Sequence, residues 1–178
     1  MKKHSIIIEL LVVIAITILT ACNGQEKAVG ATASTISAIE IAEPHLQRWE
    51  GLRLKAYTDV AGVATIGYGS TNSDLVAKGQ ITKDEALAQL RSDMTACQTC
   101  IENAVTVELT PYQKAALISF VYNVGGQAFR DSTLLKELNA GNYSEVPTQL
   151  RRWKFAGGKV IKGLINRREA EINLWNHK

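Results

Sequence analysis

The sequence predicts an α+β fold in which a small β lobe precedes a larger helical lobe. Residues 54–69 are rich in β-branched and aromatic residues and are interrupted by glycines, which is typical of short strands in a hairpin arrangement. A capping box then opens a long amphipathic segment at residues 83–104, and a strongly apolar helical pattern follows Pro111. Strands followed by a run of helices are the element order of an α+β domain.

The chain is long enough for one ordinary domain with an appendage. It has 178 residues, of which 46% are hydrophobic and 21% are charged, so a core can form and disorder throughout is excluded. A net charge of +3 is too small to indicate nucleic acid by itself. Residues 150–178 are more basic, with eight basic residues and two acidic ones. An anionic partner fits this end, and a solvated helix face is the alternative.

The first residues predict export. Lys2 and Lys3 precede an apolar run at residues 6–22, which is short for a membrane span of about 20 apolar residues and fits a secretion signal. Cys22 ends a Leu-Thr-Ala-Cys sequence that resembles a bacterial lipobox, in which the cysteine is lipidated. Two alternatives stay open: an uncleaved signal anchor that later leaves the bilayer, and a pilin-like start with Glu9 inside its apolar helix.

Composition predicts the domain boundaries. We expect a signal or anchor segment at residues 1–22, a flexible linker at residues 23–38 and a folded domain at residues 39–178. The linker is rich in glycine, alanine, serine and threonine, which is typical of a flexible connection. No repeat with a period of 20–50 residues is visible in the sequence.

The helices of the domain have separate signals. Apolar spacing predicts a first helix at residues 39–51, with Pro44 in its first turns. Thr82 and Glu85 form the capping box of the helix at residues 83–104. The helix that begins at Pro111 is unusually apolar, so we expect it to be the buried central helix. The remaining expected elements are helices at residues 132–139, 143–153 and 163–175 and a turn at residues 156–158.

Three cysteines are present, at Cys22, Cys97 and Cys100. The last two form a CxxC inside the helical pattern, whereas a thioredoxin-like motif needs a preceding strand and a zinc site needs four ligands. A disulfide between Cys97 and Cys100 fits an oxidising compartment. Two helix-surface cysteines without a role are the alternative.

The chemically informative residues lie around the predicted hairpin. Glu50 stands at a helix end beside Trp49, Asp59 follows nine residues later, and Thr65 follows six residues after that. A helix end followed by a hairpin can bring these side chains to one cleft. Glycoside hydrolysis needs one protonated and one ionised carboxyl group. Burial beside Trp49 would favour the protonated form of Glu50, and a polar hairpin would favour ionised Asp59. The spacing alone is a weak signal.

The surrounding residues make the signal specific. The chain reads WEGLRLKAYTD from Trp49 to Asp59 and TIGYG from Thr65. This stretch resembles the active-site stretch of phage-type lysozymes, glycoside hydrolase family 24, in which Glu, eight residues, Asp, five residues and Thr follow one another. One departure is Ser70, because the family usually has histidine there. Further similar segments lie at residues 81–86, 119–125, 129–135, 151–153 and 163–169.

The resemblance implies a lysozyme-like fold, with a small β-hairpin lobe and a larger helical lobe joined by a long helix around an active-site cleft. It implies an endolysin, a muramidase that hydrolyses the β-1,4 bond between N-acetylmuramic acid and N-acetylglucosamine in peptidoglycan and lyses the host cell. Glu50 would be the general acid and Asp59 the second carboxylate. Thr65 would help to orient the attacking water, and the outcome would resemble that of an inverting enzyme.

The resemblance also implies supporting residues. Arg167 would pair with Glu50 and hold it in place, and Ser132 would contact the sugar chain. The Tyr68 ring is a candidate for stacking on sugars, as is Trp153, for which core packing is the more ordinary role. No metal and no organic cofactor are implied.

The expected partners are peptidoglycan and, through residues 6–22, the inner membrane, with no nucleic acid and with the chain acting as a monomer. We expect a protein that is membrane-anchored and then periplasmic, at the host inner membrane if a phage encodes it. One alternative function is lytic transglycosylase, whose chemistry needs one acid and no water. Another is an inactive wall-binding or pilin-like protein, against which the complete set of Glu50, Asp59 and Thr65 argues.

Overall fold

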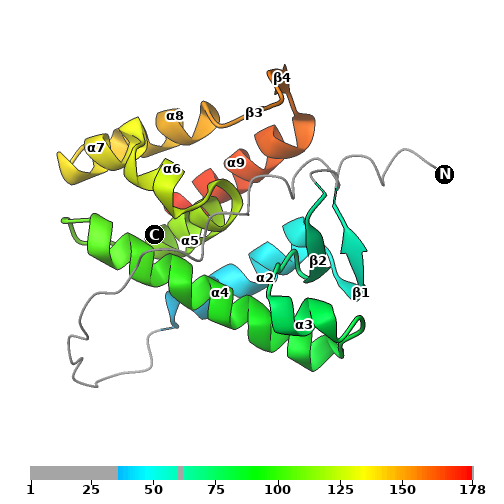
Figure 1. Cartoon of the computed structure of the whole chain (residues 1–178). Helices are drawn as coiled ribbons and strands as arrows, with labels where there is room; N and C mark the ends of the chain where they lie inside the picture. Colours follow the sequence, from blue (N-terminus) through cyan, green and yellow to red (C-terminus); the bar gives the residue numbers. More distant parts are fainter. Residues whose placement is uncertain (1–35, 60–61, 178) are drawn as a thin grey trace.

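The structure of the chain is a computed structural model that describes residues 36–59 and 62–177. The expectations for residues 1–35, which include the anchor segment, Cys22 and most of the linker, lie outside the described residues. In the described part a small β lobe and a larger helical lobe are joined by one long helix (Figure 1). The predicted α+β architecture is therefore confirmed.

The first described helix, α2 (Ala38–Glu50), begins at a capping box. The Ser37 hydroxyl accepts a hydrogen bond from the Glu40 N–H at 3.2 Å, and the Glu40 carboxylate accepts one from the Ser37 N–H at 2.8 Å. The buried residues of α2 recur every four positions, so one face of the helix lies on the core. Pro44 lies inside the helix, on its exposed face.

The β lobe follows directly. Strands β1 (Arg53–Thr58) and β2 (Ala64–Gly67) form an antiparallel hairpin, as predicted from their composition. A short helix, α3 (Ser73–Ala77), was not predicted. Its signal is Asn72, whose side-chain oxygen accepts hydrogen bonds from the N–H groups of two residues in the first turn and caps the helix.

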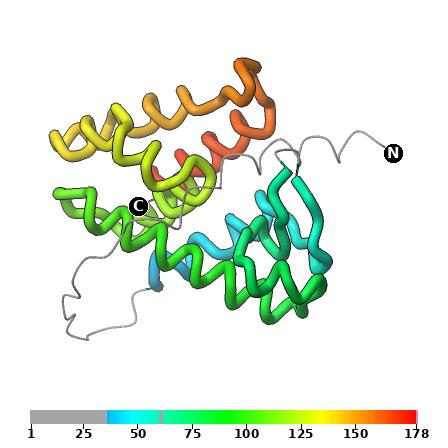
Figure 2. Tube along the Cα trace, in the orientation of Figure 1, coloured from blue at the N-terminus to red at the C-terminus, as the bar shows by residue number. Residues whose placement is uncertain are grey.

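The long helix α4 (Lys83–Ala104) has the predicted bounds, because the Thr82 capping box is formed. One end of α4 packs on β2, and the rest packs on α2, α5 and α6 of the helical lobe. Figure 2 shows the trace of α4 running beneath both lobes. The helix therefore fixes the position of the hairpin relative to the rest of the domain.

The central helix is α5 (Pro111–Val124), and every residue from 115 to 124 is buried. Helix α5 packs on α2 and α4 and on two of the later helices, α6 (Gly126–Arg130) and α9 (Lys162–Trp175) (Figure 1). Helices α7 (Thr133–Asn139) and α8 (Val146–Arg151) lie against each other, and α8 also packs on α9. No helix in the described part of the chain has both the length and the apolar character that a membrane crossing requires.

Two expected elements differ in detail. The helix predicted at residues 143–153 is a 3-10 turn (Tyr143–Glu145) followed by the short α8, because a proline stands at the start of α8. The turn predicted at residues 156–158 belongs to a small hairpin of β3 (Phe155–Ala156) and β4 (Lys159–Val160). Two successive glycines with positive φ make this tight turn.

The CxxC residues lie inside the domain. Cys97 and Cys100 are both buried on α4, so the alternative of two surface cysteines is wrong. They also stand as thiols, so the disulfide expected between them is not formed in the structure. Cys100 Sγ instead accepts a hydrogen bond from Arg130 Nη1 at 3.2 Å, which holds α6 against α4. Gly126 permits this contact, because a Cβ there would lie 2.9 Å from the same sulfur.

Replacing Thr82 by alanine is expected to lower the free energy of unfolding by about 1 kcal/mol. The change removes the acceptor that binds the Glu85 N–H at 3.1 Å and leaves this donor of the first turn without its cap. Urea unfolding measures the loss. Thr95→Ala is the matched control, because the Thr95 hydroxyl is exposed and bonds only within the same helix, to the Arg91 carbonyl. Equal losses in the two variants would contradict the capping role.

Candidate active site

Glu50 is the last residue of α2, at the base of the β hairpin. Gly51 ends the helix there with φ of +68°, a conformation that favours glycine. The Glu50 side chain is only 8% exposed, and its Oε1 accepts a hydrogen bond from Arg167 Nη1 at 2.7 Å. A Cβ at Gly69 would lie 3.7 Å from Oε2, so the backbone after β2 runs beside the carboxylate.

Asp59 and Thr65 lie at the far end of the hairpin and are both buried. Asp59 follows β1, and its Oδ1 accepts a hydrogen bond from the Val63 N–H at 2.8 Å. Thr65 lies on β2, and its hydroxyl donates to the Val63 carbonyl at 3.1 Å. The two predicted side chains are therefore fixed on one hairpin, which starts directly after Glu50.

Arg167 lies on α9 and is fully buried. Its guanidinium donates to three acceptors: Glu50 at 2.7 Å, the Ser119 carbonyl at 3.0 Å and Glu171 at 3.3 Å. Burial lowers the pKa of Arg167, but its two carboxylate partners outweigh that effect, so the pKa lies above the ordinary value. The structure thus brings together residues 50 and 167, which the resemblance had paired.

A second layer of buried polar residues lies behind Arg167 and was not predicted. Glu171 accepts hydrogen bonds from the Ser119 hydroxyl at 2.8 Å and from Arg168 Nη2 at 2.9 Å. The same Arg168 nitrogen donates to Asn123 Oδ1 at 2.9 Å. Two features of the sequence could have indicated this layer. They are Ser119 and Asn123, which lie four positions apart in the otherwise apolar α5, and the Arg-Arg-x-x-Glu sequence that starts at Arg167 in α9.

His45 lies one turn before the site on α2. Burial, followed by the positive charges of Arg167, Arg48 and Arg168, lowers the pKa of His45 to about 4. The imidazole is therefore neutral near pH 7, and its Nε2 accepts a hydrogen bond from Trp49 Nε1 at 3.2 Å. This bond fixes the indole that precedes Glu50 in the chain.

Tyr68 does not present an open face. The side chain is 5% exposed and belongs to the core, so the ring, as the structure places it, does not provide the sugar-stacking surface that was expected. Its backbone carbonyl accepts a hydrogen bond from the buried Tyr122 hydroxyl at 2.9 Å. Tyr68 therefore ties the hairpin to α5.

Ser70, the departure from the family pattern, is also buried. Its hydroxyl accepts a hydrogen bond from the Asn72 N–H at 3.3 Å, and its side chain is hydrogen-bonded to Asp93 on α4. Burial raises the pKa of Asp93, and the bonds from Gln89 and Ser70 oppose this effect. The serine therefore keeps a polar contact between the β lobe and the long helix.

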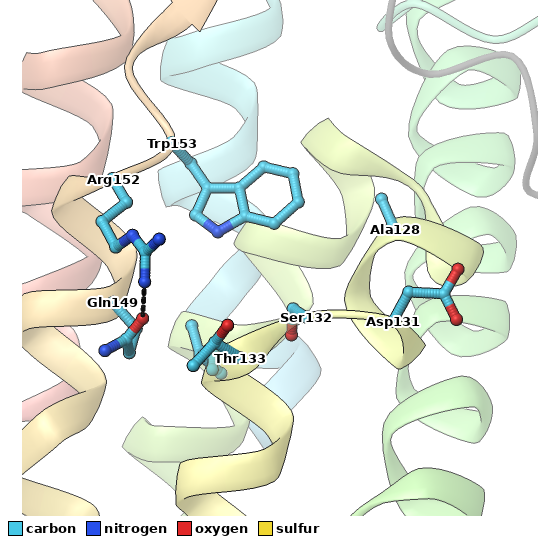
Figure 3. A pocket seen from close by; sticks show the side chains of 8 residues that line it. Ala128, Asp131, Ser132, Thr133, Gln149, Arg152 and Trp153 are labelled. Carbon is cyan, nitrogen blue, oxygen red and sulfur yellow. Dashed lines mark hydrogen bonds between the residues drawn. The ribbon is translucent and has the colours of Figure 1, made fainter.

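A pocket of about 440 Å³ lies in the helical lobe between α6, α7 and α8 (Figure 3). Trp153 forms one wall, edge-on to Phe120 at 5.2 Å between ring centroids. Arg152 donates to the Gln149 side chain at 3.0 Å along the same rim. Ser132 lines the floor, but its hydroxyl donates to the Phe129 carbonyl and accepts from Leu135 N–H, so it caps α7.

Metal chemistry has no evident site in the described residues, where no three histidine, cysteine or carboxylate side chains are grouped so as to hold an ion. The chemical arrangement is instead a buried carboxyl group with a fixed cationic partner, next to a hairpin that carries a second carboxylate. Such an arrangement can donate a proton at one place and hold a negative charge at another.

A family model described as phage lysozyme matches residues 47–171. The chain belongs to the phage lysozyme family. It is 43% identical over 137 residues to the SAR-endolysin of Escherichia phage Mu, and the match covers 77% of this chain and 80% of that relative. The family identifies the chain as a glycoside hydrolase, an endolysin of the muramidase type that lyses peptidoglycan.

Solved structures agree with this assignment. A variant of P22 lysozyme superposes with a TM-score of 0.71 at 34% identity, and the match covers 80% of this chain and all of the other (100%). The muramidase domain of SpmX from Asticaccaulis excentricus also gives a TM-score of 0.71, at 32% identity, covering 78% of this chain and 96% of that domain. The lysozyme-like fold that the resemblance implied is therefore confirmed.

The free energy of unfolding is expected to fall as the pH falls from 6.5 to about 4, the unfolded and folded pKa values of His45. In this window the unfolded chain binds a proton at His45 and the folded chain does not, so stability rises with pH. Because the imidazole is partly exposed, we expect a loss of about 2 kcal/mol.

Urea unfolding of wild type and His45→Gln at several pH values measures this effect. The glutamine variant should lose less stability over the window, whereas above pH 8, where neither state protonates the imidazole, the difference between the two proteins should be constant. Parallel curves over the whole range would exclude His45 as the source.

Proposed function

We propose that Glu50 is the general acid that protonates the leaving oxygen of the β-1,4 bond between N-acetylmuramic acid and N-acetylglucosamine. The observation that carries this proposal is the buried Glu50–Arg167 pair at 2.7 Å, at the base of the hairpin. A guanidinium at this distance stabilises the carboxylate that remains once the proton has been given away. It therefore favours proton donation, and it also holds the carboxyl group in one orientation.

Asp59 is the second carboxylate in this proposal. Acting in its ionised form, it positions water or stabilises the positive charge that develops on the sugar. Thr65 helps to orient the water, and the outcome is that of an inverting enzyme. The bonds of both side chains to the Val63 backbone support these roles, because a side chain held at one place needs little reorganisation during the reaction.

We assign the pocket beside Trp153 to contacts with the polymer. Its rim combines an aromatic ring, the Asp131 carboxylate and the Arg152 guanidinium, which suits a ligand that carries both sugars and charged peptide groups. Ser132 lines this pocket at the start of α7. Its hydroxyl is already hydrogen-bonded to the Phe129 carbonyl and the Leu135 N–H, so Ser132 shapes the pocket by its position. Peptidoglycan is the substrate in this proposal, and the chain acts on it as a monomer.

We further propose that residues 6–22 export the chain and hold it at the inner membrane before it acts in the periplasm. The apolar run and its lysine flank support this, as does the SAR-endolysin name of several relatives. Residues 23–38 would be the linker and residues 39–178 the catalytic domain. Lipidation of Cys22 and retention of an uncleaved anchor are two forms of this same attachment.

Glu50→Gln is expected to lower the rate of peptidoglycan hydrolysis at least about a hundredfold, because the amide cannot donate the required proton. Clearing of purified peptidoglycan by the full chain measures the rate. Glu43→Gln is the matched control on the same helix, since Glu43 pairs with Arg91 of α4 and should be dispensable.

Mass spectrometry of the wild-type products decides the reaction type. Products with reducing-end muramic acid that disappear in Glu50→Gln are the expected result. Anhydro products would assign the chain to the lytic transglycosylases instead. A folded Glu50→Gln protein with wild-type activity would remove Glu50 from the mechanism.

Replacing residues 6–22 by a cleavable secretion signal is expected to cause earlier lysis of a cell that expresses the chain. An enzyme pressed against the bilayer does not reach the wall, and the cleavable signal would release it at once. Culture turbidity after induction measures the timing. The same replacement combined with Glu50→Gln is the control and should not lyse the cells. Unchanged timing in the active chain would contradict the anchoring proposal.

A further inference from the structure

Four charged side chains meet in the interior where α2, α5 and α9 join. Arg167 and Glu171 are fully buried, and Arg168 is 1% exposed. Glu50 completes the group with 8% of its side chain exposed. We name these four residues the buried charge cluster. Its charges are close enough to influence one another strongly, because water does not separate them.

Glu171 is the residue on which the donors of this cluster converge. Its Oε1 accepts from the Ser119 hydroxyl at 2.8 Å, from Arg168 Nη2 at 2.9 Å and from Arg167 Nε at 3.3 Å. Its Oε2 lies 2.8 Å from Arg168 Nε in an ion-pair contact that lacks hydrogen-bond alignment. The Glu171 carboxylate has no exposed surface, so its contacts are with these protein groups.

The orientation of Arg167 follows from this arrangement. A guanidinium is planar, so fixing two of its nitrogens fixes the third. Nε is held by Glu171 and Nη2 by the Ser119 carbonyl, which directs Nη1 at Glu50. Glu171 therefore acts on Glu50 through Arg167 and has no direct contact with it.

The charge of the cluster depends on Glu50. With Glu50 ionised, two arginines and two glutamates cancel, and with Glu50 protonated one positive charge remains. Without Glu171, the protonated form of Glu50 would face two uncompensated arginines. Burial lowers the pKa of Arg168 to about 10, despite the opposing effect of Glu171, so Arg168 keeps its charge at neutral pH.

We propose that Glu171 is a positioning residue of the lysozyme reaction, which orients Arg167 toward Glu50 and offsets the charge of Arg168, and which thereby sets the pH range of hydrolysis. This inference rests on the proposed role of Glu50 as the general acid. It assigns a role to the buried ion pair of Arg168 and Glu171, which lies behind Arg167.

Other titratable and charged groups also face this site. Burial raises the pKa of Tyr122 well above its ordinary value and raises that of Cys97, so both are neutral near pH 7. His45 is neutral there as well. The remaining charged groups that act on these residues are Asp93 on α4 and Arg48 on α2. These groups are unchanged in the variants below. Differences between the pH profiles of the variants therefore reflect changes in the charges of the buried charge cluster.

The test is the pH dependence of peptidoglycan hydrolysis by the full chain, with kcat and KM determined separately. In Glu171→Gln the alkaline limb of the profile should move to lower pH by about one unit, the size expected for one charge in an interior of effective dielectric constant ~20. At the pH optimum kcat should fall about tenfold because Arg167 loses its fixed orientation. KM should stay within about twofold, since Glu171 does not touch the substrate.

Two further variants separate charge from structure. Arg168→Gln removes a positive charge, so its alkaline limb should move in the opposite direction, to higher pH. The double variant Arg168→Gln with Glu171→Gln restores the charge balance, and its limb should return toward the wild-type position. A purely structural role of the two residues cannot produce opposite shifts and a recovery in the double variant.

Glu169→Gln is the matched control, because this neighbouring carboxylate of α9 pairs with Arg151 at the surface. It should keep the wild-type profile. Thermal unfolding of each variant verifies folding, and if Glu171→Gln does not fold, the shift in Arg168→Gln decides the matter. If Glu50→Gln is inactive but the alkaline limb does not move in either Glu171→Gln or Arg168→Gln, this inference is wrong. If Glu50→Gln is active, the proposed general acid itself is wrong, and the two failures are thereby distinguished.

Discussion

The buried ion pair between Glu50 and Arg167 joins the first and the last described helices of the domain. Glu50 ends the first described helix and Arg167 belongs to the last one, 117 positions further along the chain. Charges with so little exposure lose most of their hydration, and only close partners and further hydrogen bonds offset that loss. Removing either partner alone would leave an uncompensated charge in the interior, at a cost of roughly 3–5 kcal/mol.

The central helix α5 supplies some of the hydrogen bonds that offset the lost hydration of the buried charges. Its buried residues are apolar on most sides, but Ser119 and Asn123 stand on the side that faces α9. One turn of the helix separates them, so together they bind the second layer of the cluster. Phe120 lies between them and contacts the Arg168 guanidinium, 5.0 Å from its ring centroid. Replacing the side chains of this layer by apolar ones would remove Glu171, the partner that holds Arg167 Nε.

The hairpin places two buried polar side chains, Asp59 and Thr65, beside the core. Asp59 and Thr65 are held by backbone groups of their own hairpin, so their positions do not depend on distant residues. The contact between Tyr122 and the Tyr68 carbonyl then fastens the hairpin to α5. Short-range bonds thus set the geometry within the hairpin, and one long-range bond helps to set its place against the helical lobe.

The sequence by itself determined what depends on local chemistry. The bounds of α4 follow from the Thr82 capping box, the start of α5 follows from Pro111, and the positions of Glu50, Asp59 and Thr65 follow from a motif with fixed spacing. Each of these features is decided within a few residues of the chain. The two short helices that were not predicted, α3 and α6, have only five residues each, too few for apolar periodicity to mark them.

Only the tertiary structure decided which charged residues are interior. Arg168 and Glu171 look like a solvated face of a basic helix in the sequence, yet they are buried because α9 turns that face toward Ser119 and Asn123 of α5. The same holds for Tyr68 and for the CxxC, whose burial depends on helices distant in the sequence. The resemblance implied the pairing of Arg167 with Glu50, but not the buried partners behind Arg167. Hydrogen-bonding capacity is a property of each residue, but whether water or a partner satisfies it depends on how the helices pack.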